Sequence, residues 1–382
     1  MTIPKLSTLL SLCAKVCSLA ILGGVGVAST PAAAQLAEPY YQADQVMHAF
    51  YQHSALPKAV LFNSQAHALE ALLGEACDQP GQLSKLQTHW AQTMLAWEAL
   101  QTPTVGVLVD RRSQRHIDFW PSRDKLIAQA LRQTELRQLD MDLVGSPAKG
   151  LPALAVLLGL SPTSLDVDAV KSAARCTFAN ALAADIAAES VQLLTAVSGA
   201  AQTDWATDAA ATQAAWEQLV NQWLGALERL RWTYINKPMH MALTRNDSSH
   251  AALTSDGTEP SALSLSAIEW PRPSWQLQLQ ALQAQWAQLY DLASSAGPAS
   301  ASTTGVISLQ ALLRSRGHVS LADKWGESVQ QAHVAIGQLG RGSSSTQLQV
   351  AALELGLLAQ LFQNQLASAL GVQMGFSDAD GD

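Results

Sequence analysis

The sequence has few charged residues, few aromatic residues and little cysteine. Charged residues make up 14% of the 382 residues and aromatic residues 6%, while hydrophobic residues reach 48%. This balance excludes an intrinsically disordered chain, which combines low hydrophobicity with high charge. Runs of β-branched residues are scarce, whereas Ala, Leu and Gln are abundant. The composition therefore predicts an all-α protein, and its length allows two domains with full hydrophobic cores.

Common catalytic and membrane signatures are absent as well. The sequence contains neither H-E-x-x-H nor G-x-S-x-G, the patterns of zinc peptidases and of α/β-hydrolases. After residue 34, no stretch approaches the ~20 uninterrupted apolar residues of a transmembrane helix. We therefore expect no membrane span, and a protein without enzymatic activity is favoured over a hydrolase.

The first 34 residues are typical of a secretory signal peptide. Lys5 and Lys15 are their only charges, an apolar run follows over residues 16–28, and alanines at 32–34 precede Gln35. Neither Cys13 nor Cys17 follows a small residue, which favours a soluble periplasmic or secreted protein over a lipoprotein. Removing the two lysines from 23 basic residues leaves 21 against 31 acidic ones, a net charge of −10. That charge argues against nucleic acid and anionic membranes as partners.

Two cysteines remain after this leader, Cys77 and Cys176. In an oxidising compartment an even pair favours a disulfide, and a metal site with two thiolates is the weaker alternative. The bond would join the end of the first helix to the start of a later one. Closing a loop of ~100 residues stabilises by a few kcal/mol on the chain-entropy model.

Apolar residues recur at helical spacing through most of the remaining chain. Helices are expected over 41–77 with an interruption at Pro57, and over 212–234 with Pro238 as the end. We predict two packed helical bundles of about four helices each, an N-terminal one over 35–203 and a C-terminal one over 204–382. Further helices are expected near 83–100, 124–139, 166–197, 277–289, 306–313, 321–339 and 346–370.

Two short patterns concern the predicted cores. Trp90, Met94 and Trp97 share one helix face, which is more typical of a core than of a cofactor platform. The segment 149–159, KGLPALAVLLG, is expected to start a buried helix. Pro152 is tolerated in its first turn, and Gly150 is expected to let backbone pack closely.

Several segments together resemble the imelysin-like family. They are LPKAVLFNSQAHALEALLGEAC (56–77), Trp90 and Trp97, RHIDFWP (115–121), KGLPALAVLL (149–158), ARCTFANAL (174–182) and LGVQMGFSDADGD (370–382). The resemblance covers essentially the whole chain after the leader. It implies a periplasmic all-α protein of two helical bundles with a pocket near their junction, and a link to iron uptake.

The family's G-x-H-x-x-E motif would supply a His and an acid from one helix face to a metal ion. Mapped onto this sequence, the motif falls on Gly150, Pro152 and Ala155. The glycine is kept, but neither Pro152 nor Ala155 has a side chain that can bind a metal. The family metal motif is therefore expected to be degenerate here, and whether any metal binds stays open.

Two other places could hold a cation. His67 and Glu70 have the spacing of a ligand pair on one helix face, although a solvated helix surface is the more common reading. Asp378, Asp380 and Asp382 resemble the first acids of a calcium loop, but the remaining ligands are missing. A bound metal ion, iron or calcium, is thus an option without an assigned site.

The favoured candidate for ligand binding combines arginines with aromatic residues. Arg115 and Trp120 lie in one loop, and Glu269 and Arg272 lie beside Trp270 in the C-terminal half. Such groups can clamp a carboxylate or stack on a planar ligand. The alternative is architectural, with arginines bonding loop carbonyls and tryptophan filling the junction.

The sequence therefore favours a periplasmic, non-enzymatic binding or accessory protein. Its partner would be a small ligand or a periplasmic protein, bound in an inter-bundle cleft at Arg115, Trp120, Glu269 and Arg272. The resemblance leaves two alternatives open: a metal-dependent peptidase, and a structural or protein-interaction module without ligand.

Overall fold

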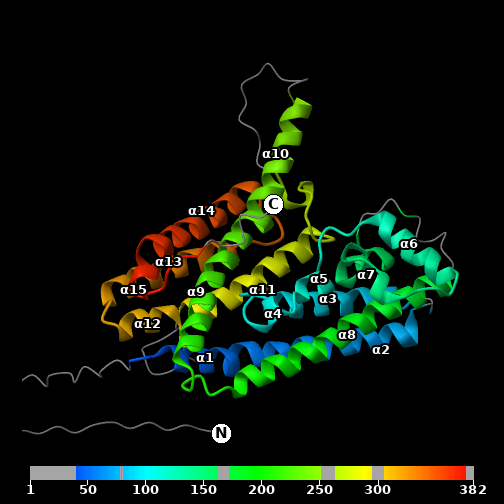
Figure 1. Cartoon of the computed structure of the whole chain (residues 1–382). Helices are drawn as coiled ribbons and strands as arrows, with labels where there is room; N and C mark the ends of the chain where they lie inside the picture. Colours follow the sequence, from blue (N-terminus) through cyan, green and yellow to red (C-terminus); the bar gives the residue numbers. More distant parts are fainter. Residues whose placement is uncertain are drawn as a thin grey trace, which may run out of the picture. The chain divides into compact units, whose positions relative to one another are not determined.

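Helices and their connections account for the described part of the chain in the computed structural model (Figure 1), which covers residues 40–77, 79, 81–161, 165, 172–250, 263–294 and 305–375. The single β-bridge in these ranges joins Ser264 to Ser344. The all-α prediction is confirmed. The expected signal peptide and the acidic tail at 378–382 lie outside the described residues.

The helices follow one another with short connections. Up to residue 202 they are α1 (Ala43–Phe50), α2 (Leu56–Ala76), α3 (Leu83–Leu100), α4 (Val107–Asp110), α5 (Ser113–Ile117), α6 (Asp124–Glu135), α7 (Gly150–Leu157) and α8 (Ser172–Gln202). After it they are α9 (Ala209–Arg231), α10 (Lys237–His250), α11 (Trp275–Ala293), α12 (Leu309–Ser315), α13 (Val319–Gly337), α14 (Ser345–Leu361) and α15 (Ala367–Ala369). Short 3-10 helices occupy Met141–Leu143, Ser146–Ala148 and Leu265–Ala267.

Two prolines do not interrupt their helices, contrary to the sequence prediction. A π-helical turn, Tyr51–Ala55, joins α1 to α2, and Pro57 is the second residue after it. A second π-helical turn, Trp232–Asn236, joins α9 to α10, and Pro238 again is the second residue after it. A π-turn changes the local hydrogen-bonding pattern, so a residue that lacks an N–H can follow it without ending the helix.

Neighbouring helices in sequence mostly pack on one another. α2 packs along α3 and α8, and α7 packs on α8 and α3, while α13 packs on α14, α12 and α11. Figure 1 shows α2, α3 and α8 side by side, with α13 and α14 together elsewhere. Contacts of α11 with α3 and of α1 with α9 join early and late helices, and the described residues belong to one compact unit. The division into bundles at residues 203 and 204 stays a prediction.

Large aromatic residues fill the core. Trp90, Met94 and Trp97 are each at most 1% exposed, so this face of α3 is core, as expected from its spacing. In the later helices, Trp223 of α9 stacks on Phe362 with ring centroids 5.3 Å apart. Burying each of these side chains removes a large apolar area from water, which is a main source of folding free energy.

The longest helix, α8, combines a core face with a covalent anchor. Its residues 173–202 are long and apolar enough, by length and composition alone, to cross a membrane. Phe178, Leu182 and Ile186 are buried where α8 packs on α2, α6 and α7, so the helix also has the properties of a core helix. Cys176 forms the expected disulfide with Cys77, with Cα atoms 5.6 Å apart, and thereby ties α8 to the end of α2.

The segment 149–159 contains α7, which is buried and closely packed at its start. Every residue of α7 is buried, including Pro152 and Ala155. Gly150 has φ +69°, and a Cβ atom there would lie 2.3 Å from the carbonyl oxygen of Ile117. The close backbone approach expected at Gly150 is thus present. It packs the start of α7 against the carbonyl of Ile117, the residue directly before Asp118.

Replacing Gly150 with alanine should therefore destabilise the protein far more than a simple glycine substitution. Gly159, at the other end of α7, has φ +66° but open space around its missing Cβ. Gly159→Ala should cost about 1 kcal/mol from backbone strain alone, and Gly150→Ala should cost at least ~2 kcal/mol more because the backbone must also move. Urea unfolding of both variants measures this difference, and equal losses would contradict the packing role of Gly150.

Candidate functional site

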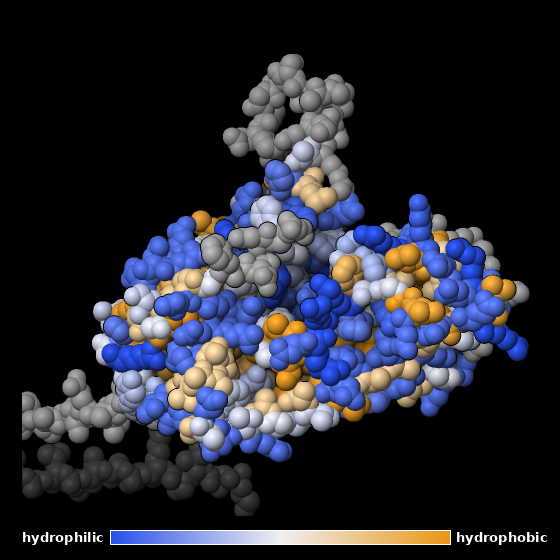
Figure 2. Space-filling model, in the orientation of Figure 1, coloured by the Kyte–Doolittle hydropathy of each residue, from blue (hydrophilic) through white to orange (hydrophobic). Residues whose placement is uncertain are grey.

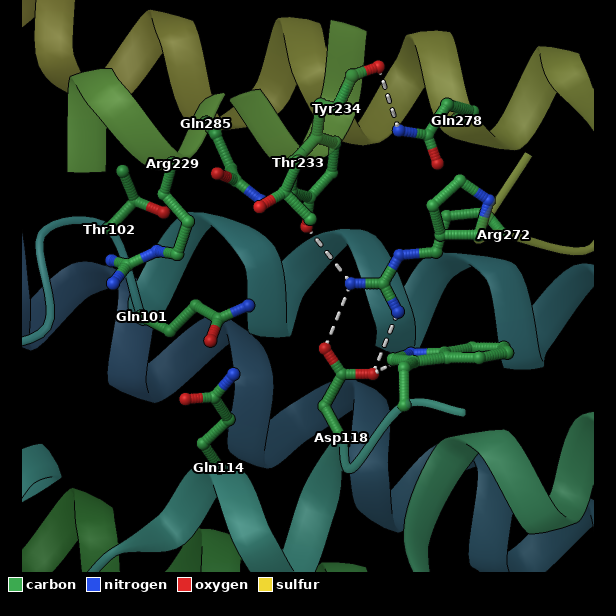
Figure 3. A pocket seen from close by; sticks show the side chains of 12 residues that line it. Gln101, Thr102, Gln114, Asp118, Arg229, Thr233, Tyr234, Arg272, Gln278 and Gln285 are labelled. Atoms are coloured by element: carbon green, nitrogen blue, oxygen red, sulfur yellow. Dashed lines mark hydrogen bonds and ion pairs between the residues drawn. The ribbon is translucent and has the colours of Figure 1, made fainter. Parts of the chain in front are cut away.

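A buried arginine lies at the centre of the candidate site (Figure 3). Arg272 precedes α11 and is 6% exposed. Its Nη1 donates to Asp118 Oδ1 at 2.8 Å, and its Nη2 donates to Asp118 Oδ2 at 2.9 Å. The same Nη2 also donates to Glu98 Oε1 and to the Tyr234 hydroxyl. Asp118 and Glu98 thus share one guanidinium.

Glu98 is completely buried near the end of α3, and each of its carboxylate oxygens has two partners. Oε1 accepts from Arg272 and from the Tyr234 hydroxyl at 3.0 Å. Oε2 accepts from the side-chain amides of Gln101 at 2.7 Å and Gln285 at 2.6 Å. Because every lone-pair direction is used, this carboxylate is a structural anchor and has no free oxygen for a cation.

Aromatic rings enclose the charged group. Trp120 donates its indole N–H to Asp118 Oδ1, and its ring lies 4.9 Å from the Arg272 guanidinium carbon. The ring of Tyr234, which belongs to the π-helical turn Trp232–Asn236, lies 5.9 Å from the same atom. Cation–π contacts of this kind add to the ion pairs that hold Arg272.

Burial and charge shift the pKa values in this cluster. Burial raises the pKa of the Asp118 carboxyl to about 7, Arg272 opposes that rise, and the Glu98 charge adds to it. Burial disfavours the charge of Arg272, but Asp118 and Glu98 outweigh it and raise its pKa well above the ordinary value. Two buried carboxylates with one guanidinium carry one excess negative charge, so the cluster favours uptake of one proton.

A cavity of about 170 Å³ adjoins the cluster. Its walls come from the end of α3, from α5 and the loop after it, from α9 and the π-helical turn that follows, and from the start of α11. The lining residues are mostly polar: Gln101, Thr102, Gln114, Asp118, Trp120, Arg229, Thr233, Tyr234, Pro271, Arg272, Gln278 and Gln285. The surface shown in Figure 2 is hollowed near its middle, and hydrophilic residues surround the hollow.

Two lining groups have unused hydrogen-bonding capacity. Arg229 of α9 is partly buried, and no residue in the described ranges bonds to its guanidinium. Figure 3 shows it on the opposite side of the group from Arg272, next to Gln101 and Thr102. Gln278 of α11 is 2% exposed, and its Oε1 is buried without a partner. Of the two, Arg229 is available to a ligand, in contrast to Arg272, whereas the Gln278 oxygen has almost no accessible surface.

The four sequence-predicted binding residues separate into two pairs. Trp120 and Arg272 lie in contact and line the cavity. Arg115 and Glu269 are exposed and are not among the lining residues. The remaining polar residues of the site were not named from the sequence. Asp118 lies within the predicted Arg115–Trp120 segment, and Glu98 is the acid beside Trp97 on a largely apolar helix.

The other candidate ligand pair, His67 and Glu70, lies on the surface of the protein. His67 Nδ1 lies 3.1 Å from Glu70 Oε2 on the exposed face of α2, within hydrogen-bonding distance. Across the described ranges, no group of three or more His, Cys, Asp or Glu side chains is arranged to hold a metal ion.

The family of this chain follows from a sequence match. The imelysin family, also described as peptidase M75, matches residues 55–270, more than half of the chain. The chain belongs to the imelysin family. This match includes α3, α5 and α9, which supply most of the site, as well as the segment 149–159.

Two solved structures have the same fold at low sequence identity. An imelysin-like protein from Psychrobacter arcticum 273-4 is 16% identical with a TM-score of 0.57, and the match covers 88% of this chain and 99% of that one. A protein from Parabacteroides distasonis ATCC 8503, named as an iron-regulated protein A precursor, is 14% identical with a TM-score of 0.62, covering 86% and 95%. No protein with a curated function matches this chain.

Removing the central guanidinium should be costly. Arg272→Met would leave Glu98 and Asp118 buried without their counter-charge, and we expect a loss of about 3–5 kcal/mol in unfolding free energy. Arg229→Met is the matched control, because it removes a guanidinium from the same cavity that has no ion pair, and it should change stability by less than ~1 kcal/mol. Chemical unfolding of both variants tests this contrast, and similar losses would refute it.

Stability should also depend on pH through Asp118. Its pKa is raised in the folded state, so between pH ~4 and 7 the folded protein keeps a proton that the unfolded chain releases. The contribution of Asp118 to stability therefore falls as the pH rises through this range. Asp118→Asn cannot titrate, so its melting temperature relative to the parent should rise from pH 4.5 to pH 8. A constant or falling difference would show that Asp118 is ionised throughout.

Proposed function

We propose that this imelysin-family chain is a periplasmic, non-enzymatic binding or accessory protein whose ligand occupies the cavity beside Arg272. The observation that carries the proposal is a polar cavity with fixed walls. The ion pairs of Arg272 hold the loop after α5 and the start of α11 to α3, while Arg229 keeps an unpaired guanidinium at the cavity wall. Preorganised polar groups in a concave site are typical of ligand binding.

The arrangement supports binding more than hydrolysis. The carboxylates that could act as bases are Glu98 and Asp118, and both are engaged by Arg272. A general base must reach a substrate or a metal-held water, and neither carboxylate has a free oxygen directed into the cavity by these contacts. The metal-dependent peptidase that the family name suggests finds no specific support in this geometry.

A role in iron uptake would then be indirect. The relative from Parabacteroides distasonis is named as iron-regulated, and in this chain the positions assigned to the metal motif, Pro152 and Ala155, are buried apolar residues of α7. We propose that any link to iron acquisition proceeds through a bound small molecule or a periplasmic partner. The leader and the disulfide of Cys77 with Cys176 support an oxidising compartment.

A thermal-shift screen of the mature protein tests this function. The screen should contain charged and neutral polar molecules of up to about ten heavy atoms, together with ferrous, ferric, zinc and calcium salts. A ligand present at 100 times its Kd stabilises by about 2.7 kcal/mol, which raises the melting temperature by several °C. We expect such a shift from at least one organic molecule, and none from a metal salt alone.

Blocking the cavity provides the specificity control. Gln114 is exposed at the cavity, so Gln114→Trp should obstruct it with little effect on folding, whereas Gln338→Trp adds the same side chain at an exposed position away from it. The organic ligand should stabilise the Gln338→Trp protein and not the Gln114→Trp protein. If no organic molecule stabilises the parent, or if Gln114→Trp has no effect, the cavity is not a binding site.

A further inference from the structure

Arg229 brings a guanidinium to the cavity that no described residue pairs with. It lies at the cavity wall without a hydrogen bond or ion pair to any residue in the described ranges. Burial lowers the pKa of Arg229, while Tyr234 and Glu98 oppose that change. A partly buried guanidinium gains most from an oxyanion, because its planar fork forms two parallel charge-assisted hydrogen bonds with a carboxylate or a phosphate.

The neighbouring acids already have partners. Glu98 and Asp118 both pair with Arg272. On α9 itself, Glu228 pairs with Arg231 at 2.6 Å. An anion for the remaining guanidinium is therefore expected from outside the described chain.

The free guanidinium lies where the cavity opens to solvent. Figure 3 shows Arg229 on the same side of the cavity as Gln101 and Gln114, away from Arg272. Gln114 belongs to α5, is exposed, and forms no side-chain hydrogen bond to a described residue. A ligand that enters past Gln114 can pair with Arg229 without displacing the ion pairs of Arg272.

The segment that carries Gln114 is basic. Arg112 and Arg115 are both exposed, and neither is paired with a residue in the described ranges. Arg111 differs, because Glu189 accepts two hydrogen bonds from it, at 2.9 and 2.7 Å. In Figures 1 and 2, α4 and α5 lie beside the hollow of the surface, which strongly hydrophilic residues border. In a chain with a net charge of −8, unpaired arginines at this edge create a local positive potential that attracts anions.

We propose that the cavity binds a small oxyanion, a carboxylate or a phosphate, whose charged end pairs with Arg229 while Arg112 and Arg115 attract it to the opening. The cavity volume of about 170 Å³ is comparable to that of an engineered cavity of ~150 Å³ that binds benzene, so the ligand has roughly six heavy atoms. This inference rests on the proposed binding function and specifies its ligand. Arg229 supplies affinity at short range, and the two exposed arginines supply a long-range contribution that salt screens.

Calorimetric titration with small molecules of similar size tests the requirement for charge. Propionate carries a carboxylate, methyl phosphate carries a phosphate, and propionamide is the neutral analogue of propionate. At least one of the two anions should bind, and propionamide should not bind measurably. Binding of propionate alone assigns a carboxylate site, binding of methyl phosphate alone assigns a phosphate site, and binding of both assigns a general oxyanion site.

Variants at Arg229 test its contact with the anion. Loss of a charge-assisted pair should weaken anion binding roughly 10–100-fold in Arg229→Met, and Arg229→Lys should be intermediate because it keeps the charge but loses the fork. Arg231→Met is the matched control on the same helix, because it removes an arginine that Glu228 already pairs. This control should bind the anion as the parent does.

The exposed arginines should act through an attraction that salt screens. Arg112→Gln and Arg115→Gln should each weaken binding about twofold at ~10 mM salt and have no effect at ~300 mM, where the Debye length is only a few ångströms. The loss in Arg229→Met should persist at both salt concentrations. Lys85→Gln removes an exposed charge about 24 Å along α3 from the Gln101 end of the helix, and it should have little effect at either concentration.

The outcomes separate this inference from the function on which it rests. A neutral molecule that binds in the screen while neither anion binds would overturn the oxyanion assignment and leave the binding function intact. Anion binding that Arg229→Met does not weaken would overturn it as well. Equal effects of Arg112→Gln, Arg115→Gln and Lys85→Gln at low salt would refute the role of the exposed arginines. If no molecule binds the parent protein, both proposals fail.

Discussion

The structure around the site depends on one buried guanidinium shared by two carboxylates. Arg272 joins Glu98 of α3 to Asp118 of the loop after α5. Asp118 lies 154 residues and Glu98 174 residues before Arg272 in the sequence. Charges so deeply buried are tolerated only when they are paired and fully hydrogen-bonded. Gln101, Gln285, Tyr234 and Trp120 complete those bonds. The cluster therefore fixes three segments and defines one wall of the cavity.

Two backbone features place the parts of this cluster. The π-helical turn Trp232–Asn236 lets one long helix continue past Pro238 while it directs Tyr234 toward Arg272. On the other side, Gly150 lets the start of α7 approach the carbonyl of Ile117, directly before Asp118. The indole of Trp90 donates to the Leu151 carbonyl at 2.9 Å and ties the same helix start to α3. The segment 149–159 thus supports the site by packing.

Some features of the fold and of the site could be predicted from the sequence, and others could not, for physical reasons. The disulfide of Cys77 with Cys176, the buried face of Trp90 and Trp97, and the close packing at Gly150 follow from local chemistry. The two prolines were misread because a π-turn leaves no mark in residue spacing. Glu98 was missed because a single acid on a helix normally faces water, and its buried position depends on Arg272, far away in the chain. Arg229 and Arg231 look equivalent in sequence, and only tertiary contacts show which one is already paired.

One arginine of the cavity, Arg272, is held by the protein, and the other, Arg229, is open to a ligand. Side-chain NMR of the guanidinium groups tests it most directly, with signals assigned by Arg272→Lys and Arg229→Lys substitution. The Nη protons of Arg272 should be slow in rotation and protected from solvent exchange, because Asp118 and Glu98 hold them. Those of Arg229 should exchange rapidly. Equal protection of the two arginines, or a mobile Arg272, would contradict the account.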